Sequence, residues 1–276
     1  MLKHKAIENI VSVKWLHNNL QDENLIIFDA TISKVVDDIS ALSKIKIPGA
    51  QFFDIKKKFS NTEAPFPNTI PSVKQFEENI QALGVNSNSV IVIYDKHGIY
   101  SSARAWWLLK TFGFNNVAVL DGGLPEWNAK GFITEAIKTY NKVEKGNFKV
   151  KYNLNNFVAF SSLSAISKDN DFKIIDARSS DRFQCIVAEP RKGLKSGTIP
   201  SSINLPFSKV LNGNRLKPKA ELKIIFNALA KENQHLVFSC GSGITASILA
   251  LAATIVGYKN SVYDGSWTEY ASLTIA

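Results

Sequence analysis

The chain has 276 residues, of which 45% are hydrophobic and 11% aromatic. This length and composition suit one large or two ordinary globular domains and exclude an extended disordered chain. The two cysteines are too few for a disulfide framework, which indicates a reducing compartment. The net charge of +9 raises nucleic acid as a partner. The lysines are scattered, however, and lack zinc-finger spacing, so we expect a solvated basic surface and no nucleic-acid partner.

The sequence pattern is not the one expected of a secretory signal peptide or of a membrane span. The N-terminal segment has no long apolar run of the kind a secretory signal needs. The most apolar stretch, ILALAATIV at 248–256, is too short to cross a bilayer. We therefore expect a cytoplasmic protein that makes no contact with membranes.

Short β-branched runs bounded by turn residues predict six buried strands, three in each half of the chain. They are expected at 24–31, 89–95, 116–123, 172–179, 235–240 and 260–267. Helical patterns at 101–114 and 243–258 lie between them. Near-continuously apolar strands that alternate with helices predict parallel sheets in an α/β fold.

The second half of the chain repeats the first. IIFDAT at 26–31 corresponds to KIIDAR at 173–178, and VLDGGLPEW at 119–127 corresponds to VYDGSWTEY at 262–270. The order of the matched segments is kept and their separation barely drifts, which indicates a domain duplication. We predict domains at 1–140 and 158–276, joined by a polar linker at 141–157.

One position separates the two copies chemically. VIYDK at the end of the second predicted strand aligns with VFSCG, so Asp95 in the first copy faces Cys240 in the second. The second copy is therefore expected to carry the chemistry, and the first to support it without reacting.

Cys240 opens the loop CGSGIT, between a predicted strand and an apolar helix. Gly241 and Gly243 permit positive φ, so that successive amides could point inward around an anion. The helix start adds partial positive charge, and both effects favour a thiolate at Cys240. Ser242 and Thr245 add hydroxyl donors. The alternative is an inert, buried cysteine, and a sulfur enclosed away from a substrate cleft would favour it.

These features resemble the tandem-domain rhodanese family of sulfurtransferases, and within it the 3-mercaptopyruvate sulfurtransferases. CGSGIT is similar to that subfamily's active loop, which reads cysteine-glycine-serine-glycine-valine-threonine. Other family-like segments are VSVKWL (11–16), ARAWWLLKTFG (103–113), DARSSDRF (176–183), EPRKG (189–193) and IPSSINLPF (199–207). The resemblance implies two tandem rhodanese-like α/β domains. Each would be a small parallel sheet flanked by helices on both faces, with the active site at the cleft between the domains.

The resemblance also implies a two-step reaction. Cys240 would take the sulfur atom of 3-mercaptopyruvate as a persulfide, release pyruvate, and pass the sulfur to a thiol such as that of thioredoxin, or to cyanide. This is covalent catalysis, and it needs no metal or organic cofactor. Ser242 is expected to help deliver the proton that pyruvate requires.

Substrate recognition follows from the same resemblance. Arg182 and Arg191 match the family's two substrate-binding arginines and suit the carboxylate of a 2-oxo acid. The remaining loop residues are expected to line the bound substrate; they are Gly241, Gly243, Ile244 and Thr245. Arg178 is expected to be structural.

The sequence departs from the family in one place that bears on the reaction. Related enzymes often have a histidine that works with an aspartate and the loop serine as a proton relay. The best-aligned residue is Asn68, and an amide cannot titrate. Cys185, between the two arginines, is either a bystander or a partner for a disulfide with Cys240.

Three other functions remain open. Thiosulfate could replace mercaptopyruvate as donor, although thiosulfate-preferring relatives typically carry basic residues in this loop and CGSGIT has none. The chain could also be a sulfur carrier or binding scaffold without turnover. A phosphatase of the cysteine-x5-arginine type is disfavoured, because the clamp position holds Ala246.

Overall fold

The computed structural model describes residues 6–33, 44–137 and 143–274. They fall into two compact units. The first contains residues up to 61, 70–153 and 213–215, and the second contains 62–69, 154–212 and 216 onward. The domain limits at 140 and 158 and the linker between them remain predictions.

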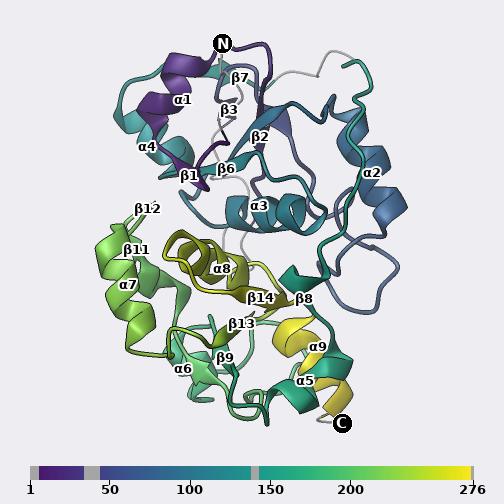
Figure 1. The fold of residues 1–276 in the computed structure, drawn as a ribbon, viewed down its shortest axis with the longest axis vertical. Helices are drawn as coiled ribbons and strands as arrows, with labels where there is room; N and C mark the ends of the chain where they lie inside the picture. Colours follow the sequence, from purple (N-terminus) through teal and green to yellow (C-terminus); the bar gives the residue numbers. More distant parts are fainter. Residues whose placement is uncertain (1–5, 34–43, 138–142, 275–276) are drawn as a thin grey trace. The chain divides into compact units, whose positions relative to one another are not determined.

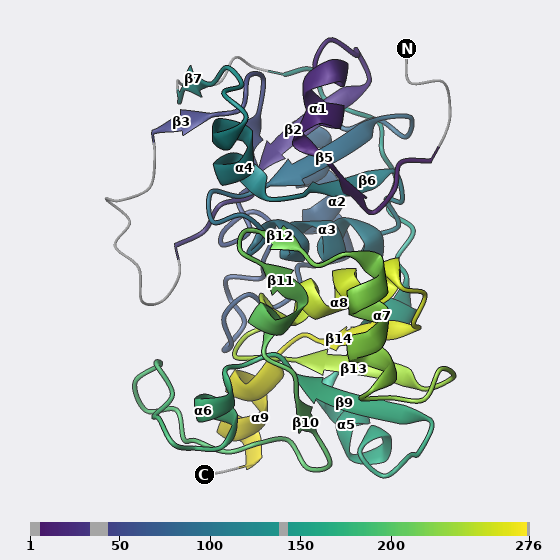
Figure 2. The same cartoon turned by 90° about the vertical axis from the view of Figure 1, so that its left-hand side faces the viewer.

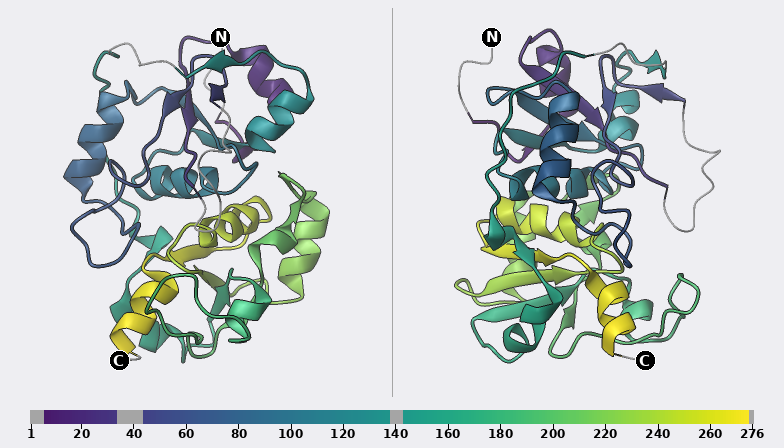
Figure 3. Two further views of the ribbon diagram at one scale, coloured as in Figure 1. Left: turned by 180° about the vertical axis from the view of Figure 1, so that it is seen from behind. Right: turned by 90° about the vertical axis from the view of Figure 1, so that its right-hand side faces the viewer.

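The first unit is built on a sheet of five parallel strands (Figure 1). Their spatial order is β1 (Ile10–Val11), β6 (Val117–Leu120), β5 (Val90–Tyr94), β2 (Leu25–Asp29) and β4 (Gln51–Phe52). Four helices accompany the sheet: α1 (Val13–Asn19), α2 (Val73–Ala82), α3 (Ser102–Thr111) and α4 (Gly123–Ala129). Helices α1 and α4 lie on one side of the sheet, and α2 and α3 on the other (Figures 2 and 3).

The second unit repeats this plan. Its parallel strands are ordered β8 (Phe157–Val158), β14 (Asn260–Tyr263), β13 (His235–Ser239), β9 (Phe172–Asp176) and β10 (Ile203–Asn204). Its helices are α5 (Phe160–Ile166), α6 (Ser180–Phe183), α7 (Lys219–Asn227), α8 (Ala246–Ile255) and α9 (Ser266–Thr274). Helices α7 and α8 lie on one side of the sheet, and α5 and α9 on the other (Figure 2).

The two strand orders correspond position by position, so the predicted duplication and the α/β fold with helices on both faces are confirmed. Each predicted strand contains one of the six long strands of the two sheets, although the observed strands are shorter. The predicted runs extended into the residues after each strand, where the chain turns. The predicted helices appear as α3 and α8.

Minor elements complete the described chain. They are the antiparallel pair β3 (Ile45–Lys46) and β7 (Glu135–Ala136), the pair β11 (Leu211–Asn212) and β12 (Arg215–Leu216), and the 3-10 turns at Leu154–Asn156 and Phe207–Val210. Within the described residues, no helix is both long and apolar enough to cross a membrane.

Side chains along each strand point alternately to the two faces of the sheet, so helices can pack against both faces. In the first unit, Ile27, Val92 and Ala118 join a cluster with residues of α1 and α4. Phe28, one residue from Ile27, faces the opposite way and begins a run of aromatic contacts. The run continues through Phe53, Phe59, Phe76 and Phe112, which brings in α2 and the end of α3. In the second unit, α5 and α9 share a cluster with Val237, while Phe238 contacts Phe226 of α7.

Candidate active site

Cys240 is the first residue after β13, at the carboxyl end of the central strand of the second sheet. Ligands of open parallel sheets gather at this edge. The first turn of α9 fixes the loop, because the amides of Trp267 and Thr268 donate to the carbonyl oxygens of Cys240 and Gly241 at 2.9 and 3.0 Å. Residue Cys240 is only 2% exposed. Among the other residues of the loop, Gly241 and Thr245 are partly exposed.

The side chain of Ser266 forms hydrogen bonds with two residues of the cysteine loop. Its Oγ accepts the amide hydrogens of Cys240 and Gly243, each at 3.1 Å, and donates to the carbonyl of Tyr263 at 2.9 Å. Ser266 has φ 51°, in the left-handed region that is uncommon for a residue with a Cβ. Such strain concentrates at functional sites.

The sequence analysis missed Ser266, although the repeat contained a signal. Ser266 corresponds to Gly123 in the first copy, which has nearly the same φ of 55°. A Cβ on Gly123 would meet the carbonyl oxygens of Asp95 and Gly98 at 2.4 Å. Only the second copy therefore has room for a side chain here, and it uses that side chain to hold the cysteine loop.

The backbone amides of the loop fall into two groups. The amides of Cys240 and Gly243 donate to the Ser266 hydroxyl oxygen. Within the described part of the chain, no acceptor is found for the amides of Gly241, Ser242, Ile244 and Thr245. Thr245 is the residue before α8, whose start adds partial positive charge. These four donors are free to stabilise a bound anion.

The two loop glycines serve different purposes, which corrects one expectation. Gly243 has φ 78°, as expected, but Gly241 does not have a positive φ. Gly241 instead lies against the ends of two arginine side chains. A Cβ there would lie 3.0 Å from Nη2 of Arg182 and 3.7 Å from Nη1 of Arg191. Both predicted substrate arginines thus lie close to the residue next to Cys240.

Arg191 and Asn68 meet at Ser242. Nη2 of Arg191 donates to the Ser242 Oγ at 2.9 Å, and Nη1 donates to the hydroxyl of Thr268 at 3.1 Å. Asn68 donates through Nδ2 to the same Oγ at 3.0 Å and to the Ser242 carbonyl at 3.1 Å. Thr268 is a second residue that the sequence analysis missed, and its hydroxyl in turn donates to the carbonyl of Gly241.

Arg182 is held by a buried carboxylate. Its guanidinium donates to Glu189 at 2.6 Å, and Glu189 also accepts from Arg178 at 2.8 Å. The side chain of Arg182 keeps 24% of its surface exposed, whereas that of Glu189 keeps 1%. The guanidinium of Arg182 is therefore held by buried Glu189 while part of the side chain stays exposed at the site.

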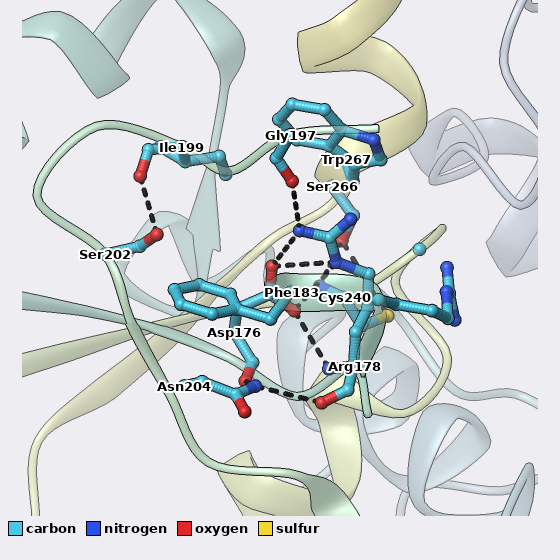
Figure 4. Close-up of polar contacts among 12 residues, drawn as sticks. Asp176, Arg178, Phe183, Gly197, Ile199, Ser202, Asn204, Cys240, Ser266 and Trp267 are labelled. Atoms are coloured by element: carbon cyan, nitrogen blue, oxygen red, sulfur yellow. Dashed lines mark hydrogen bonds and ion pairs between the residues drawn. The ribbon is translucent and has the colours of Figure 1, made fainter. Parts of the chain in front are cut away.

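Arg178 is completely buried at the base of this network (Figure 4). Its guanidinium pairs with Asp176 at 2.7 Å, donates to the carbonyl of Gly197, and lies 4.8 Å from the ring centre of Trp267. Burial opposes the charge of Arg178, but Asp176 and Glu189 outweigh it and raise the pKa of the guanidinium. These contacts agree with a structural role for Arg178.

Cys185 and Cys240 are both free thiols in very different surroundings. Cys185 is exposed and has φ 61°, and its Sγ lies 3.9 Å from the carbonyl of Phe183. Cys240 is buried. The disulfide hypothesis for this pair remains untested.

The corresponding loop of the first copy is filled by its own side chain. Asp95 follows β5 as Cys240 follows β13. Its carboxylate accepts the amides of His97, Tyr100 and Ser102 at 2.8–2.9 Å and the Ser102 hydroxyl at 2.7 Å. A loop of this design therefore surrounds a negative group with donors, and in the first copy that group is part of the protein.

Known proteins are similar to this chain in sequence and in fold. The rhodanese-like domain family matches residues 12–130 and 160–273, which is most of each copy. The chain belongs to the rhodanese family. This assignment confirms the predicted resemblance.

Relatives within the rhodanese family are similar over nearly the whole chain. A protein of Arabidopsis thaliana named thiosulfate/3-mercaptopyruvate sulfurtransferase 2 is 35% identical, over 96% of this chain and 84% of its own. The 3-mercaptopyruvate sulfurtransferase of Escherichia coli K12 is 33% identical, over 95% of this chain and 94% of its own. The predicted enzyme class, a sulfurtransferase, is thereby confirmed.

Solved rhodanese structures agree in fold. The crystal structure of the Escherichia coli 3-mercaptopyruvate sulfurtransferase SseA superimposes with a TM-score of 0.82 at 30% identity, covering 95% of this chain and 99% of that one. The structure of Tum1 from Saccharomyces cerevisiae gives a TM-score of 0.84 at 26% identity, covering 96% and 95%. The shared architecture extends over both copies.

Proposed function

We propose that this rhodanese moves the sulfur atom of 3-mercaptopyruvate to a thiol or cyanide through a persulfide on Cys240. The observation that carries the proposal is the convergence of two guanidinium groups on Gly241, the residue after Cys240. A planar guanidinium binds a carboxylate through two parallel hydrogen bonds. A 2-oxo acid held there would bring its own sulfur toward the cysteine.

In the first step, the Cys240 thiolate attacks the sulfur of the donor. An S–S bond forms, and the electron pair of the donor's C–S bond moves onto the carbon, giving the enolate of pyruvate. The enolate takes up one proton, and the thiol proton of the donor leaves the new persulfide. The products are pyruvate and a persulfide anion, which the unoccupied loop amides and the start of α8 would stabilise.

In the second step, a thiophilic acceptor attacks the outer sulfur of the persulfide. The S–S bond breaks, the sulfur leaves with the acceptor, and the Cys240 thiolate is restored. Dividing the transfer into two displacements lowers the barrier of each.

Arg191 is the better candidate for the first contact with the donor carboxylate. Its Nη1 donates to the neutral hydroxyl of Thr268, which a donor carboxylate would displace, while its Nη2 stays on the Ser242 Oγ. Arg182 already donates to the carboxylate of Glu189 and would add a second, shared contact. Gly241, Gly243, Ile244 and Thr245 would frame the donor with backbone atoms.

The low exposure of Cys240 restricts the size of the donor. Because Cys240 is only 2% exposed, a donor that reaches its sulfur must be small, and an inert cysteine, the alternative, would be equally buried. This geometry fits 3-mercaptopyruvate and also thiosulfate. The second candidate is disfavoured because thiosulfate-preferring relatives typically carry basic residues within this loop, and CGSGIT has none.

The acceptor and the compartment follow from the same chemistry. A thiol such as that of thioredoxin, or cyanide, would remove the sulfur, and neither nucleic acid nor membrane is needed. We place the protein in the cytoplasm, because its two cysteines are unpaired and the reaction needs Cys240 as a free thiolate, which reducing surroundings preserve. The mitochondrial matrix is the alternative, since one similar protein of Arabidopsis thaliana is named as mitochondrial.

A comparison of donors tests the proposal. The purified chain is supplied with 3-mercaptopyruvate or thiosulfate and a common thiol acceptor, and kcat/KM is measured for each. We expect a clear preference for 3-mercaptopyruvate, with pyruvate formed in step with sulfur transfer. A preference for thiosulfate would favour the second candidate, and a single sulfur transferred without turnover would favour a carrier.

A further inference from the structure

Asn68 is an unusual residue for its position. It is 5% exposed and has φ 61°, in the left-handed region where asparagine is tolerated better than most residues. It lies in segment 62–69, which belongs to the second unit although β9, the first long strand there, begins only at Phe172. A segment distant in sequence thus delivers one amide to the cysteine loop.

The orientation of this amide follows from its partners. One partner is the backbone carbonyl of Ser242, which can only accept a hydrogen bond. The atom that faces it must therefore be the amide nitrogen, Nδ2. The same nitrogen donates its other hydrogen to the Ser242 Oγ at 3.0 Å.

The Ser242 hydroxyl is then constrained from two sides. Its oxygen accepts from Asn68 and from Arg191, at 3.0 and 2.9 Å. A hydroxyl has two acceptor sites and one hydrogen, so both acceptor sites are filled. Its hydrogen must point away from both donors.

We propose that Asn68 is a positioning residue that, together with Arg191, makes Ser242 an obligatory hydrogen-bond donor toward the reacting carbon of the substrate. The inference deepens the proposed function and rests on it. It also explains how the chain could manage without a titrating residue at position 68, because the amide orients the proton rather than carrying it.

The proton balance of the first step is consistent with this role. Ser242 gives its proton to the enolate carbon, and pyruvate is complete. The negative charge that develops on the Ser242 Oγ is stabilised by the donors already in place, Asn68 and the charged Arg191. The thiol proton released from the new persulfide restores the hydroxyl, so no other proton source is required.

Two substitutions of Asn68 separate orientation from folding. Asn68→Gly keeps the left-handed backbone without strain and removes only the amide. Asn68→Asp keeps the shape but presents a carboxylate, which cannot donate to either Ser242 oxygen. Asn212→Asp makes the same change of charge at an exposed residue of the second unit and serves as the control.

We expect Asn68→Gly to lower kcat for 3-mercaptopyruvate about tenfold, because one orienting hydrogen bond is lost in the transition state. KM should stay within about twofold of the value for the unchanged chain. Asn68→Asp should lower kcat further, and Asn212→Asp should leave both constants unchanged. In a chain that already carries Ser242→Ala, adding Asn68→Gly should cause no additional loss, since Asn68 acts through Ser242.

The inference is overturned if Asn68→Gly leaves kcat unchanged, raises KM alone, or lowers kcat by the same factor whether or not Ser242 is present. Equal rates for Ser242→Ala and the unchanged chain would also overturn it. If the unchanged chain produces no pyruvate from 3-mercaptopyruvate, the proposed function fails as well, and this outcome is distinct from the others.

Discussion

At the scale of single residues, Cys240 and Asp95 occupy the same place in two copies of one loop. Asp95 is surrounded by donors from His97, Tyr100 and Ser102. Cys240 has free loop amides beside it instead, so that a transferred sulfur can occupy the corresponding space. Under the proposed function, this difference of one residue would give the reactive group to the second copy.

Replacing the cysteine tests this assignment. Cys240→Ser should abolish sulfur transfer, because a serine hydroxyl does not form a persulfide. The fold should survive, since the two side chains have nearly the same volume. Steady-state transfer and circular dichroism measure the two effects, and residual transfer at the original rate would remove Cys240 from the reaction.

The two arginines should differ in kinetic effect. Arg191→Ala should raise KM for 3-mercaptopyruvate by about 30-fold, because a charge-assisted hydrogen bond contributes about 2 kcal/mol. Arg182→Ala should raise KM less, since Glu189 already occupies part of that guanidinium. Initial rates over a range of donor concentrations decide between them, and the opposite order would mean that Arg182 makes the main contact.

Ser266 offers a test of the loop support. Ser266→Gly should relieve the strain of a positive φ while removing the acceptor of two loop amides. Stability to urea should therefore change little, whereas persulfide formation should slow about tenfold as the loop loses its fixed geometry. Thr274→Gly, at the other end of α9, is a control for the effect of glycine in this helix. An unchanged rate for Ser266→Gly would show that the loop holds its shape without this serine.

Some of these residues were predictable from the sequence and others were not. Cys240, Ser242, Arg182 and Arg191 were named in advance and converge on one site, because loop and motif place them locally. Ser266 was missed because a serine with positive φ contradicts local preference. The resemblance associated position 68 with the loop serine, but the two hydrogen bonds that an asparagine donates there could not be predicted.

At the scale of elements, corresponding strand-to-helix loops hold Asp95 in the first unit and Cys240 in the second. Each central strand ends at the residue before Asp95 or Cys240, and each loop leads into an apolar helix, α3 or α8. The six long strands were predictable because buried parallel strands form continuous apolar runs. Their ends were not, because the apolar pattern continues into the turns.

The loop of the first copy should contribute to stability alone. Asp95→Ala would leave three amides and a hydroxyl buried without an acceptor, at a cost of about 3 kcal/mol. Asp171→Asn, at an exposed aspartate, should stay within about 0.5 kcal/mol. Urea unfolding measures both, and equal midpoints would mean that the carboxylate does not hold the loop.

His235, the first residue of β13, should make stability depend on pH. Burial lowers the pKa of its imidazole, and Lys259 lowers it further. The folded state therefore binds protons less readily than the unfolded chain. The contribution of His235 is fully present above the unfolded value of about 6.5 and is lost as the pH falls toward the folded value.

His235→Gln keeps a polar partner for the Ser261 hydroxyl, which lies 3.0 Å from the imidazole Nε2. The unchanged chain should lose more unfolding free energy between pH 7.5 and pH 5.5 than this variant does. Denaturant unfolding at the two pH values checks the difference. Parallel losses in the two proteins would show that the histidine does not titrate on unfolding.

At the scale of the whole molecule, the chain is a duplicated fold, and we propose a reactive group in one of its two copies. The parallel strand orders of the two units agree with the repeat seen in the sequence. The sequence repeat predicted the fold, because the same order of apolar runs in each half of the chain is expected to form the same sheet twice. The central question is therefore chemical: whether one sulfur atom is held covalently, and where.

The two cysteines should respond differently to reagents. Exposed Cys185 should be alkylated rapidly by iodoacetamide, and buried Cys240 more slowly. Addition of 3-mercaptopyruvate should change the product at Cys240 from an alkylated thiol to an alkylated persulfide, which is heavier by one sulfur atom, without affecting Cys185. Peptide mass mapping of the modified chain records both rates, and faster alkylation of Cys240 would mean that its sulfur is open to solvent.

The most direct test is the mass of the intact protein after treatment with 3-mercaptopyruvate in the absence of an acceptor. The account predicts a gain of the mass of one sulfur atom per chain, located on Cys240, absent from Cys240→Ser and removed by a thiol acceptor as the transferred product appears. No gain in mass, a gain at Cys185, or a gain that an acceptor cannot remove would contradict it.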